Sequence, residues 1–442
     1  MKQIFLKDLS DHLDKEIELY GWVNTVRDHK KIVFLDLRDS TGTVQVVADA
    51  EAASLSPEDV VVIKGLVKKR PEKLVNSKTP NGSIEVEAKQ VSLVSKSHTL
   101  PFDMGKEELG LTLPVLLDNR TLTLRHHSVQ KIFKVQEAVA EGFRNVAKEL
   151  GCTEIFVPTI AASSTEGGAE VFEIKYYEHK ASLTQSPQLY KQMLVPTFER
   201  VYTISHAYRA ESSVTTRHLT ETIQMDCEFG FVNFEELLDL LEKVCVGMIK
   251  HAETTHKDIV EEFTKRPVLY GKVPRLTLTE AQEKIHKEFG RVVKDIKDMS
   301  PEDEQDICKW AREKKSSDFV IITHYPTAKR AFYTKPDPKN PEFSLSYDVL
   351  FRGLEICSGS ERINDYQELV DVIKKRGMNP DDFEMYLMAF KYGMPTEGGF
   401  SYGLERVTKQ LLDLGNVRES SLFPRDMERV DVRFSKSKKL KS

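Results

Sequence analysis

Cysteine is scarce in this sequence, and no two cysteines form a CxxC pair. The 442 residues include five cysteines, an odd number, scattered along the chain. A disulfide framework needs an even set and a zinc site needs closely spaced ligands, so neither is indicated. We interpret the cysteines as reduced packing residues.

Long hydrophobic runs are also absent. No stretch approaches the roughly 20 apolar residues of a membrane span, and residues 1–6 do not resemble a signal peptide, so we expect a cytoplasmic protein with no membrane partner. The net charge of −5 argues against a protein that coats nucleic acid indiscriminately, although it leaves room for a local basic face. With 40% hydrophobic and 30% charged residues, the composition is that of a globular protein of two or three domains.

Residues 15–95 carry the alternating apolar pattern of short β-strands. Five strands are predicted, at 17–23, 33–37, 44–46, 60–67 and 84–94. They indicate a small closed barrel of the OB type, whose open face commonly binds oligonucleotides. Phe34, Arg38 and Gln45 fall on the outward side, where they could stack on and read an unpaired base. The alternative is that Phe34 covers the mouth of the barrel.

Residues 202–231 are predicted to form a hairpin rich in charged side chains. Arg209 lies near the end of the first strand, Arg217 and His218 lie in the loop at 212–218, and Asp226 lies in the second strand. A guanidinium offers a rigid bidentate fork to phosphate oxygens, so the two arginines suit a phosphate ligand. The alternative is a solvated ribbon of salt bridges.

Four further features suit a small ligand. Residues 165–170 form a glycine-flanked acidic loop, and residues 185–192 are dense in side-chain hydrogen-bond donors. Asp348 and Glu355 could reach one Mg2+, which favours one or two carboxylates together with nucleotide phosphates. The glycines of 398–406 would let a flat base approach the backbone. Each feature also has an ordinary interpretation as a surface loop, a helix start or an exposed charge.

In chain order, these segments resemble the class II aminoacyl-tRNA synthetases of the aspartyl and asparaginyl branch. Arg209-Ala210-Glu211 with the following Thr-Arg-His-Leu is similar to motif 2, the helix and strand at 129–158 to motif 1, and residues 398–406 to motif 3. The resemblance covers nearly the whole chain. It implies an α+β fold, with a six- or seven-stranded antiparallel sheet flanked by helices and an all-β OB-fold barrel before it.

The resemblance also implies the domain boundaries. We expect the barrel at 1–98, a hinge at 99–127 and the catalytic domain at 128–442, with a helical insertion around 276–317. Little in this insertion points to chemistry.

The resemblance assigns residues to the site. The catalytic set is Arg209, Glu211, Arg217, His218 and Arg406. ATP would be bound by Arg209, Glu211, Arg217, His218, Leu219, Glu355, Gly403 and Arg406, and its Mg2+ by Asp348, Glu355 and Ser358. L-Aspartate would be bound by Glu166, Gln188, Lys191, Asp226, Ser358 and Arg362. Anticodon bases would be contacted by Phe34, Gln45 and Glu85.

The activity implied by the resemblance is the joining of aspartate to tRNA. A homodimer would activate aspartate with ATP to an adenylate and transfer it to tRNA(Asp), through positioning and electrostatics rather than a protein nucleophile. Departures from the family pattern occur at Thr222, Glu361, 396–397 and 401–402. They leave an asparaginyl enzyme and a non-catalytic tRNA-binding paralogue open as alternatives. A ligase that amidates aspartate without tRNA is disfavoured by the OB barrel. The sequence leaves open whether tRNA(Asn) is charged as well.

Overall fold

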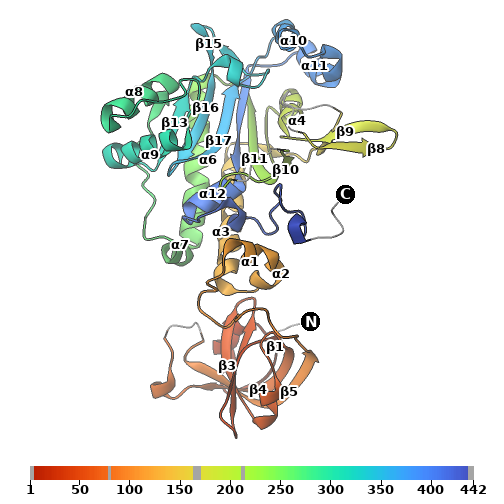
Figure 1. Ribbon diagram of the computed structural model, residues 1–442, viewed down its shortest axis with the longest axis vertical. Coiled ribbons are helices and arrows are strands. Elements are labelled where there is room, and N and C mark those ends of the chain that lie inside the picture. The colour runs from red at the N-terminus through yellow and green to blue at the C-terminus, as the bar shows by residue number, and fades with distance from the viewer. Residues whose placement is uncertain (1–3, 78–80, 163–170, 211–214, 437–442) are drawn as a thin grey trace. The chain divides into compact units, whose positions relative to one another are not determined.

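The computed structural model describes residues 4–77, 81–162, 171–210 and 215–436. The chain divides into two compact units, Met1–Thr112 and Leu113–Ser442. Figure 1 labels most of their helices and strands. The predicted contacts of Glu166 and Glu211 lie outside the described residues.

The first unit is a closed five-stranded barrel with strand order β1-β2-β3-β5-β4. Its strands are β1 (Glu16–Asp28), β2 (Val33–Asp39), β3 (Gly42–Ala48), β4 (Val60–Lys69) and β5 (Ile84–Ser95). The apolar residue of each alternating pair points inward, and Val33, Leu35 and Leu37 are fully buried. The predicted OB barrel is therefore confirmed.

The second unit is built on an eight-stranded sheet in the order β12-β13-β16-β17-β18-β11-β10-β6. Its strands are β6 (Thr153–Glu154), β10 (Arg200–Tyr208), β11 (Glu221–Gly230), β12 (Arg275–Thr277), β13 (Phe319–Thr323), β16 (Ser346–Phe351), β17 (Leu354–Glu361) and β18 (Glu397–Gly403). The predicted antiparallel sheet is confirmed in its six central strands, β13-β16-β17-β18-β11-β10, and the structure differs from the prediction only at the two edges. The short edge strands β6 and β12 are included, and each pairs in parallel with its neighbour.

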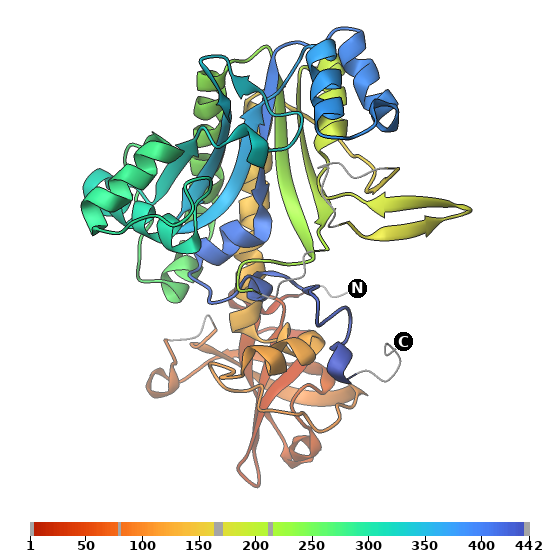
Figure 2. The ribbon, with the colours of Figure 1, turned by 45° about the horizontal axis from the view of Figure 1, so that its top comes forward.

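Twelve α-helices accompany this sheet in the described part of the second unit. They are α1 (Leu113–Asp118), α2 (Arg120–Thr123), α3 (His127–Glu149), α4 (Gln188–Met193), α5 (Val195–Phe198), α6 (Phe234–Thr255), α7 (Lys257–Phe263), α8 (Leu278–Phe289), α9 (Pro301–Lys315), α10 (Tyr366–Lys375), α11 (Glu384–Lys391) and α12 (Leu404–Leu411). Smaller sheets are formed by β7 (Ile160–Ala161), β8 (Glu173–Tyr176) and β9 (His179–Leu183), and by β14 (Pro336–Asp337) and β15 (Asn340–Ser344). Figure 2 shows the β8–β9 hairpin extending outward from the unit.

The two faces of the central sheet differ because side chains alternate along each strand. On β11, Met225, Cys227 and Phe229 are fully buried in the core formed with α3 and α6. Gln224, Asp226 and Glu228 alternate with them and belong to the opposite face, so three polar side chains lie on one side of the sheet. That face carries the candidate site.

The structure corrects two predicted boundaries. The expected hinge at 99–127 is divided between the units, because 113–127 forms helices whose Arg120 donates hydrogen bonds to the carbonyl oxygens of Glu419, Ser421 and Leu422. The expected insertion at 276–317 is helical in α8 and α9, but strand β12 at its start belongs to the main sheet.

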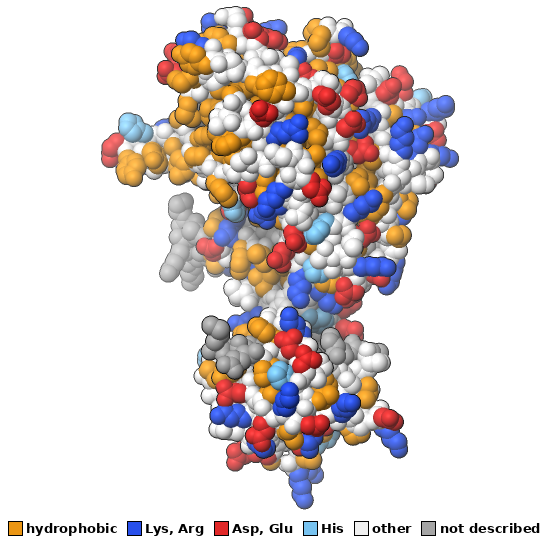
Figure 3. Space-filling model, turned by 180° about the vertical axis from the view of Figure 1, so that it is seen from behind, with side chains coloured by type: hydrophobic (Ala, Val, Ile, Leu, Met, Phe, Trp, Pro, Cys, Tyr) orange, Lys and Arg blue, Asp and Glu red, His pale blue; other side chains and the backbone are white. Residues whose placement is uncertain are grey.

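The surface is mixed in charge, and Figure 3 shows acidic and basic side chains interspersed over the face seen from behind. Across the described residues, no helix is long and apolar enough to cross a membrane.

Candidate functional site

A row of polar residues crosses four neighbouring strands of the central sheet. Asp348 on β16 pairs with Ser358 on β17, Ser358 with Ser401 on β18, and Ser401 with Asp226 on β11. The next row contains Ser360, Gly399 and Glu228. Register alone therefore gathers residues that are far apart in the sequence.

A cleft of about 240 Å³ opens beside this row. It is lined by Arg209, Arg217, His218, Leu219, Thr222, Gln224, Glu355, Ile356, Cys357, Ser358, Ser401, Gly403, Glu405, Arg406 and Val417. Seven of the eight residues predicted to bind ATP are among them, and the eighth, Glu211, is not described. The cleft thus combines three arginines with two glutamates.

Hydrogen bonds and ion pairs hold three basic side chains of this cleft in place, those of Arg406, Arg217 and His218. Arg406 Nη1 donates to the Glu355 carbonyl oxygen at 3.0 Å and lies 3.5 Å from its carboxylate oxygen Oε1. Arg217 forms an ion pair with Glu304 of α9. His218 Nδ1 is 2.7 Å from Thr215 Oγ1, which orients the imidazole ring.

Glu304 is a site residue that the sequence prediction missed. It also accepts a hydrogen bond from the backbone N–H of Glu355 at 3.2 Å, so α9 supports two sides of the cleft. Burial raises the pKa of Glu304 to about 7, against the opposing effect of Arg217. The helical pattern of 276–317 gave no sign of this role, because the partner Arg217 is 87 residues away.

The predicted metal ligands are close enough to interact, but one is already paired. Arg330 donates from Nη1 and Nη2 to both oxygens of Asp348, at 3.1 and 2.7 Å, and from Nη1 to Ser358 Oγ at 3.0 Å. Burial and the nearby Asp348 raise the pKa of Glu355. Two carboxylates that repel each other beside a cleft suit a divalent cation. Arg330 was not predicted, and a cation at Asp348 would have to displace it.

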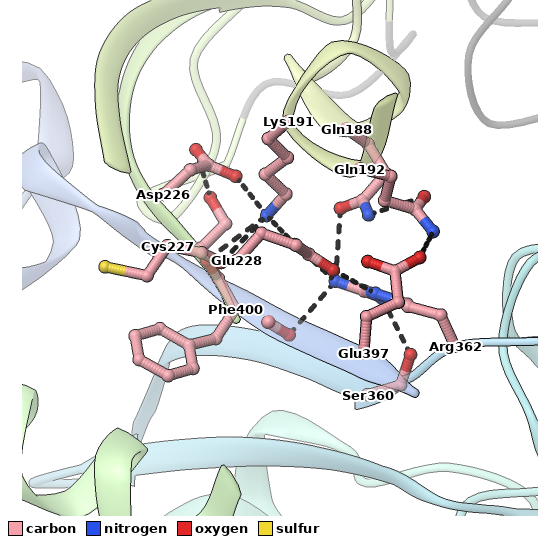
Figure 4. A network of polar contacts seen from close by, with 12 residues as sticks. Gln188, Lys191, Gln192, Asp226, Cys227, Glu228, Ser360, Arg362, Glu397 and Phe400 are labelled. Carbon is pink, nitrogen blue, oxygen red and sulfur yellow. Dashed lines mark hydrogen bonds and ion pairs between the residues drawn. The ribbon is translucent and has the colours of Figure 1, made fainter. Parts of the chain in front are cut away.

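Four of the six residues predicted to bind the amino acid form a buried network beside the cleft, namely Gln188, Lys191, Asp226 and Arg362 (Figure 4). Of the other two, Ser358 lines the cleft itself and Glu166 lies outside the described residues. Lys191 Nζ lies 2.8 Å from Asp226 Oδ1 and 3.1 Å from Glu228 Oε2. Burial alone would lower the pKa of Lys191, but these two carboxylates outweigh it and raise the pKa. Ser401 Oγ, which faces the cleft, donates to Asp226 Oδ2 at 3.1 Å and connects the two regions.

Arg362 is the second buried cation of this network. Its Nε donates to Glu228 Oε1 at 2.8 Å, and its Nη2 donates to Gln188 Oε1 at 3.2 Å and to the Gly399 carbonyl oxygen at 3.0 Å. Its Nη1 donates to Ser360 Oγ at 2.7 Å. Burial opposes the charge of Arg362, yet Glu228 more than compensates and raises its pKa. The guanidinium is therefore held rigidly.

Two more members of the network were missed from the sequence. Gln192 Nε2 donates to Glu397 Oε1 at 2.7 Å, and its Oε1 accepts from Gln188 Nε2 at 2.9 Å. Glu397 is fully buried. Burial, reinforced by the charge of Glu228, raises the pKa of Glu397 well above its usual range.

Glu228, which the sequence prediction also left out of the site, could have been found from the sequence. Glu228 stands two residues after Asp226 on the same strand, so the alternation of side chains places both on one face. Gln192 lies in the donor-rich segment 185–192 and Glu397 directly precedes the glycines of 398–406, but no local pattern distinguishes either residue from its neighbours.

The residues that depart from the family pattern do not all lie in the same part of the site. Thr222 and Ser401 line the cleft, whereas Tyr402 is buried and donates to the Leu241 carbonyl oxygen at 2.8 Å. Glu361 forms an ion pair with Lys335 at 2.6 Å and so has its own cation.

The predicted anticodon residues lie together on the outer surface of the barrel. Gln45 Nε2 donates to Glu85 Oε2 at 3.2 Å, across neighbouring strands. Phe34 is half-buried, and its ring meets the His29 ring edge-on at a centroid distance of 5.5 Å. Arg27 pairs with Asp36 on the adjoining strand. An aromatic ring beside polar side chains suits an unpaired base.

Comparison with known proteins identifies both units. The family model "tRNA synthetases class II (D, K and N)" matches residues 113–427, and the model "OB-fold nucleic acid binding domain" matches residues 17–94. An aspartate–tRNA(Asp/Asn) ligase of Thermus thermophilus is 40% identical over 97% of this chain and 99% of its own length. One of Methanocaldococcus jannaschii is 38% identical over 96% of each chain.

Solved structures agree with this similarity. Asparaginyl-tRNA synthetase from Pyrococcus horikoshii, complexed with asparaginyl-adenylate, superposes with a TM-score of 0.89 at 29% identity, covering 97% of this chain and 99% of that one. Aspartyl tRNA synthetase from Entamoeba histolytica gives 0.84 at 28% identity, covering 97% and 92%. The arginine-lined cleft, the buried network beside it and the OB barrel thus occur in a chain that belongs to the class II tRNA synthetases.

Proposed function

We propose that the protein is an aspartate–tRNA ligase, which activates L-aspartate with ATP and transfers it to the 3′ end of tRNA(Asp). The observation that carries this proposal is the pair of buried cations, Lys191 and Arg362, next to an arginine-lined cleft. The choice of aspartate is also supported by similarity, since the relatives at 40% and 38% identity are named for aspartate and the asparaginyl structure shares 29%.

In the proposed first step, the aspartate α-carboxylate attacks the α-phosphorus of ATP. The bond from that phosphorus to the bridging oxygen breaks, and pyrophosphate leaves with the electron pair. Arg209, Arg217 and Arg406 line the cleft and would stabilise the charge on the phosphates. The adenylate is then attacked by a terminal ribose hydroxyl of tRNA, which gives the ester and releases AMP.

We propose that ATP binds with Mg2+. Glu355, Asp348 and Ser358 would hold the ion. The ion would neutralise phosphate charge. In the second step the chain's own contribution is to orient the adenylate and the ribose hydroxyl.

The proposal is tested by aminoacylation of purified tRNA(Asp). We expect the protein to form aspartyl-tRNA in the presence of ATP and Mg2+, with asparagine giving no product. Esterification of asparagine alone would support the asparaginyl alternative, and binding of tRNA without any product would support the non-catalytic one.

A second proposal concerns the range of tRNAs. The relatives at 40% and 38% identity are named for both tRNA(Asp) and tRNA(Asn), so we propose that this chain charges both. The same assay with tRNA(Asn) tests this, and charging of tRNA(Asp) alone would contradict it. Phe34, Gln45 and Glu85 are proposed to contact the anticodon bases.

We propose a cytoplasmic homodimer formed around the edge strand β6. Phe156, two residues beyond β6, is 88% exposed, which is unusual for a large apolar side chain. Sedimentation of the purified protein should give twice the chain mass of 50.5 kDa. In Phe156→Asp the measured mass should fall toward that of a single chain.

A further inference from the structure

Glu397 is a buried acid that forms no ion pair with any residue in the described part of the chain. It lies in β18, and none of its side chain is exposed to solvent. Its Oε1 accepts a hydrogen bond from Gln192 Nε2, whereas its Oε2 is buried and has no hydrogen-bond partner among the described residues. A buried polar atom in this state is costly, and such atoms mark sites where a ligand can supply the missing partner.

The charges around Glu397 are already balanced. Lys191 and Arg362 carry two positive charges, and Asp226 and Glu228 carry two negative charges in direct ion pairs with them. Among the described residues of this network, an ionised Glu397 would be a third carboxylate beside two cations. Desolvation and the repulsion from Glu228 oppose that ionisation and so favour the uncharged acid.

The protonated oxygen is identified by the hydrogen bonds. Because Oε1 is occupied as an acceptor, the proton belongs on Oε2. Figure 4 shows the carboxyl group of Glu397 between the amide of Gln192 and the side chain of Arg362, beside Gln188. Oε2 therefore faces the residues proposed to contact the substrate side chain.

We propose that Glu397 selects the amino acid as an uncharged carboxylic acid, whose Oε2–H donates a hydrogen bond to the side-chain carboxylate of the substrate. This inference rests on the proposed aspartate activity. The substrate supplies an acceptor to the unpartnered group, and the uncharged form keeps an additional negative charge out of a site that must admit a carboxylate. Ionisation of Glu397 would reverse both effects.

The titration of Glu397 depends on groups from β11, α4 and α11 and on Arg362, which follows β17. Glu228 on β11 favours the proton, and Lys191 on α4 and Arg362 after β17 favour its loss. Gln192 on α4 stabilises the anion through its hydrogen bond, and the phenol of Tyr386 on α11 also interacts with the carboxyl group.

The test compares three forms of the full chain in aspartate-dependent exchange of pyrophosphate into ATP. In Glu397→Gln the amide can still donate, so KM for aspartate should stay within about threefold of the unsubstituted protein. In Glu397→Leu the donor is lost, so KM for aspartate should rise at least about tenfold, while KM for ATP should not change. An unchanged KM for aspartate in Glu397→Leu would overturn the proposal.

A second readout does not depend on activity. The infrared carbonyl band of a protonated carboxylic acid, taken as the difference between the unsubstituted protein and Glu397→Gln, reports the proton on Glu397. From about pH 6 to about pH 9, this band and KM for aspartate should change together, with KM rising up to about tenfold per pH unit once the band declines. A band that is lost while KM stays constant, or a KM that rises equally in Glu397→Gln, would overturn the proposal.

Glu361→Gln is the matched control, because Glu361 is a neighbouring buried acid that has Lys335 as its own cation. It should keep the pH dependence of the unsubstituted protein. Failure of the aspartate assignment gives a different result: no exchange with aspartate at any pH, with the infrared band still present.

Discussion

At the scale of single residues, the buried charges of the site are held by specific partners. Arg362 uses three of its nitrogens to bind Glu228, Ser360, Gln188 and the Gly399 carbonyl oxygen. A planar guanidinium can do this, whereas an ammonium group is a point charge. The geometry of the fork, as well as its charge, is therefore part of the proposed aspartate site.

Arg362→Lys tests whether the forked geometry of the guanidinium matters, because the substitution keeps the positive charge. We expect KM for aspartate to rise at least about tenfold and the free energy of unfolding to fall by about 1–3 kcal/mol, because Lys cannot satisfy all four partners. Exchange kinetics and chemical denaturation measure the two effects.

Arg352→Lys is its control. Arg352 is similarly buried and pairs with Asp318 at 3.1 Å, outside the lining of the cleft. The Arg352→Lys variant should be less stable than the unsubstituted protein and should have the same KM for aspartate. Equal changes of KM in the two variants would contradict a specific role of Arg362.

Glu405 gives a prediction for pH. Both of its oxygens accept from the backbone N–H of Ile223 at 3.1 Å, and burial raises its pKa from 4.5 to about 7. Because the folded-state pKa is the higher one, the linked stability is complete below the unfolded value and is lost as pH rises through about 7. The shift corresponds to at most about 3 kcal/mol.

Thermal unfolding at about pH 5 and about pH 8 checks this linkage. The decrease in Tm between these values should be smaller in Glu405→Gln than in the unsubstituted protein. Glu428→Gln, which removes an exposed carboxylate, should leave the decrease unchanged. If Glu405→Gln shows the same decrease as this control, Glu405 does not carry the linkage.

At the scale of elements, strand register assembles the site, and β18 lies at its centre. A Cβ at Gly399 would overlap the Cys227 carbonyl oxygen and the Glu228 carboxylate. We expect Gly399→Ala to displace Glu228, to lower stability by about 1–3 kcal/mol and to reduce aspartate-dependent exchange at least about tenfold.

Gly415→Ala is the control for this change, since its Cβ would meet no atom closer than 3.6 Å. It should retain stability and exchange activity. Full activity of Gly399→Ala would show that close packing of β18 on β11 is not needed for the site.

The sequence predicts elements better than it predicts how they meet. The spacing of Val33, Leu35 and Leu37 predicts their strand, because buried residues recur with the two-residue period of a strand. The ion pair between Arg362 and Glu228 joins residues 134 positions apart, and no local period encodes it. Motif resemblance supplied Arg362, Lys191 and the cleft arginines, whereas Glu304 became visible only where α9 packs against the sheet.

At the scale of the whole molecule, the two proposed binding sites fall in different units. All residues that line the cleft come from the second unit, and the proposed anticodon contacts come from the first. Amino-acid activation and tRNA selection should therefore respond to different substitutions.

Phe34→Ala tests this division. We expect KM for tRNA in aminoacylation to rise about tenfold, because stacking of a base on an aromatic ring is worth about 1–3 kcal/mol. Exchange of pyrophosphate, which requires no tRNA, should be unchanged. Tyr20→Ala, which removes an exposed aromatic ring on a different strand of the barrel, should leave both assays unaffected. Loss of exchange in Phe34→Ala would contradict the division of tasks.

The central claim is that the cleft and the buried network bind ATP and aspartate side by side. Amino-acid-dependent exchange of pyrophosphate into ATP, measured without tRNA, tests it most directly. We predict exchange with L-aspartate and none with L-asparagine. Exchange with asparagine alone, or no exchange with either amino acid, would contradict the account.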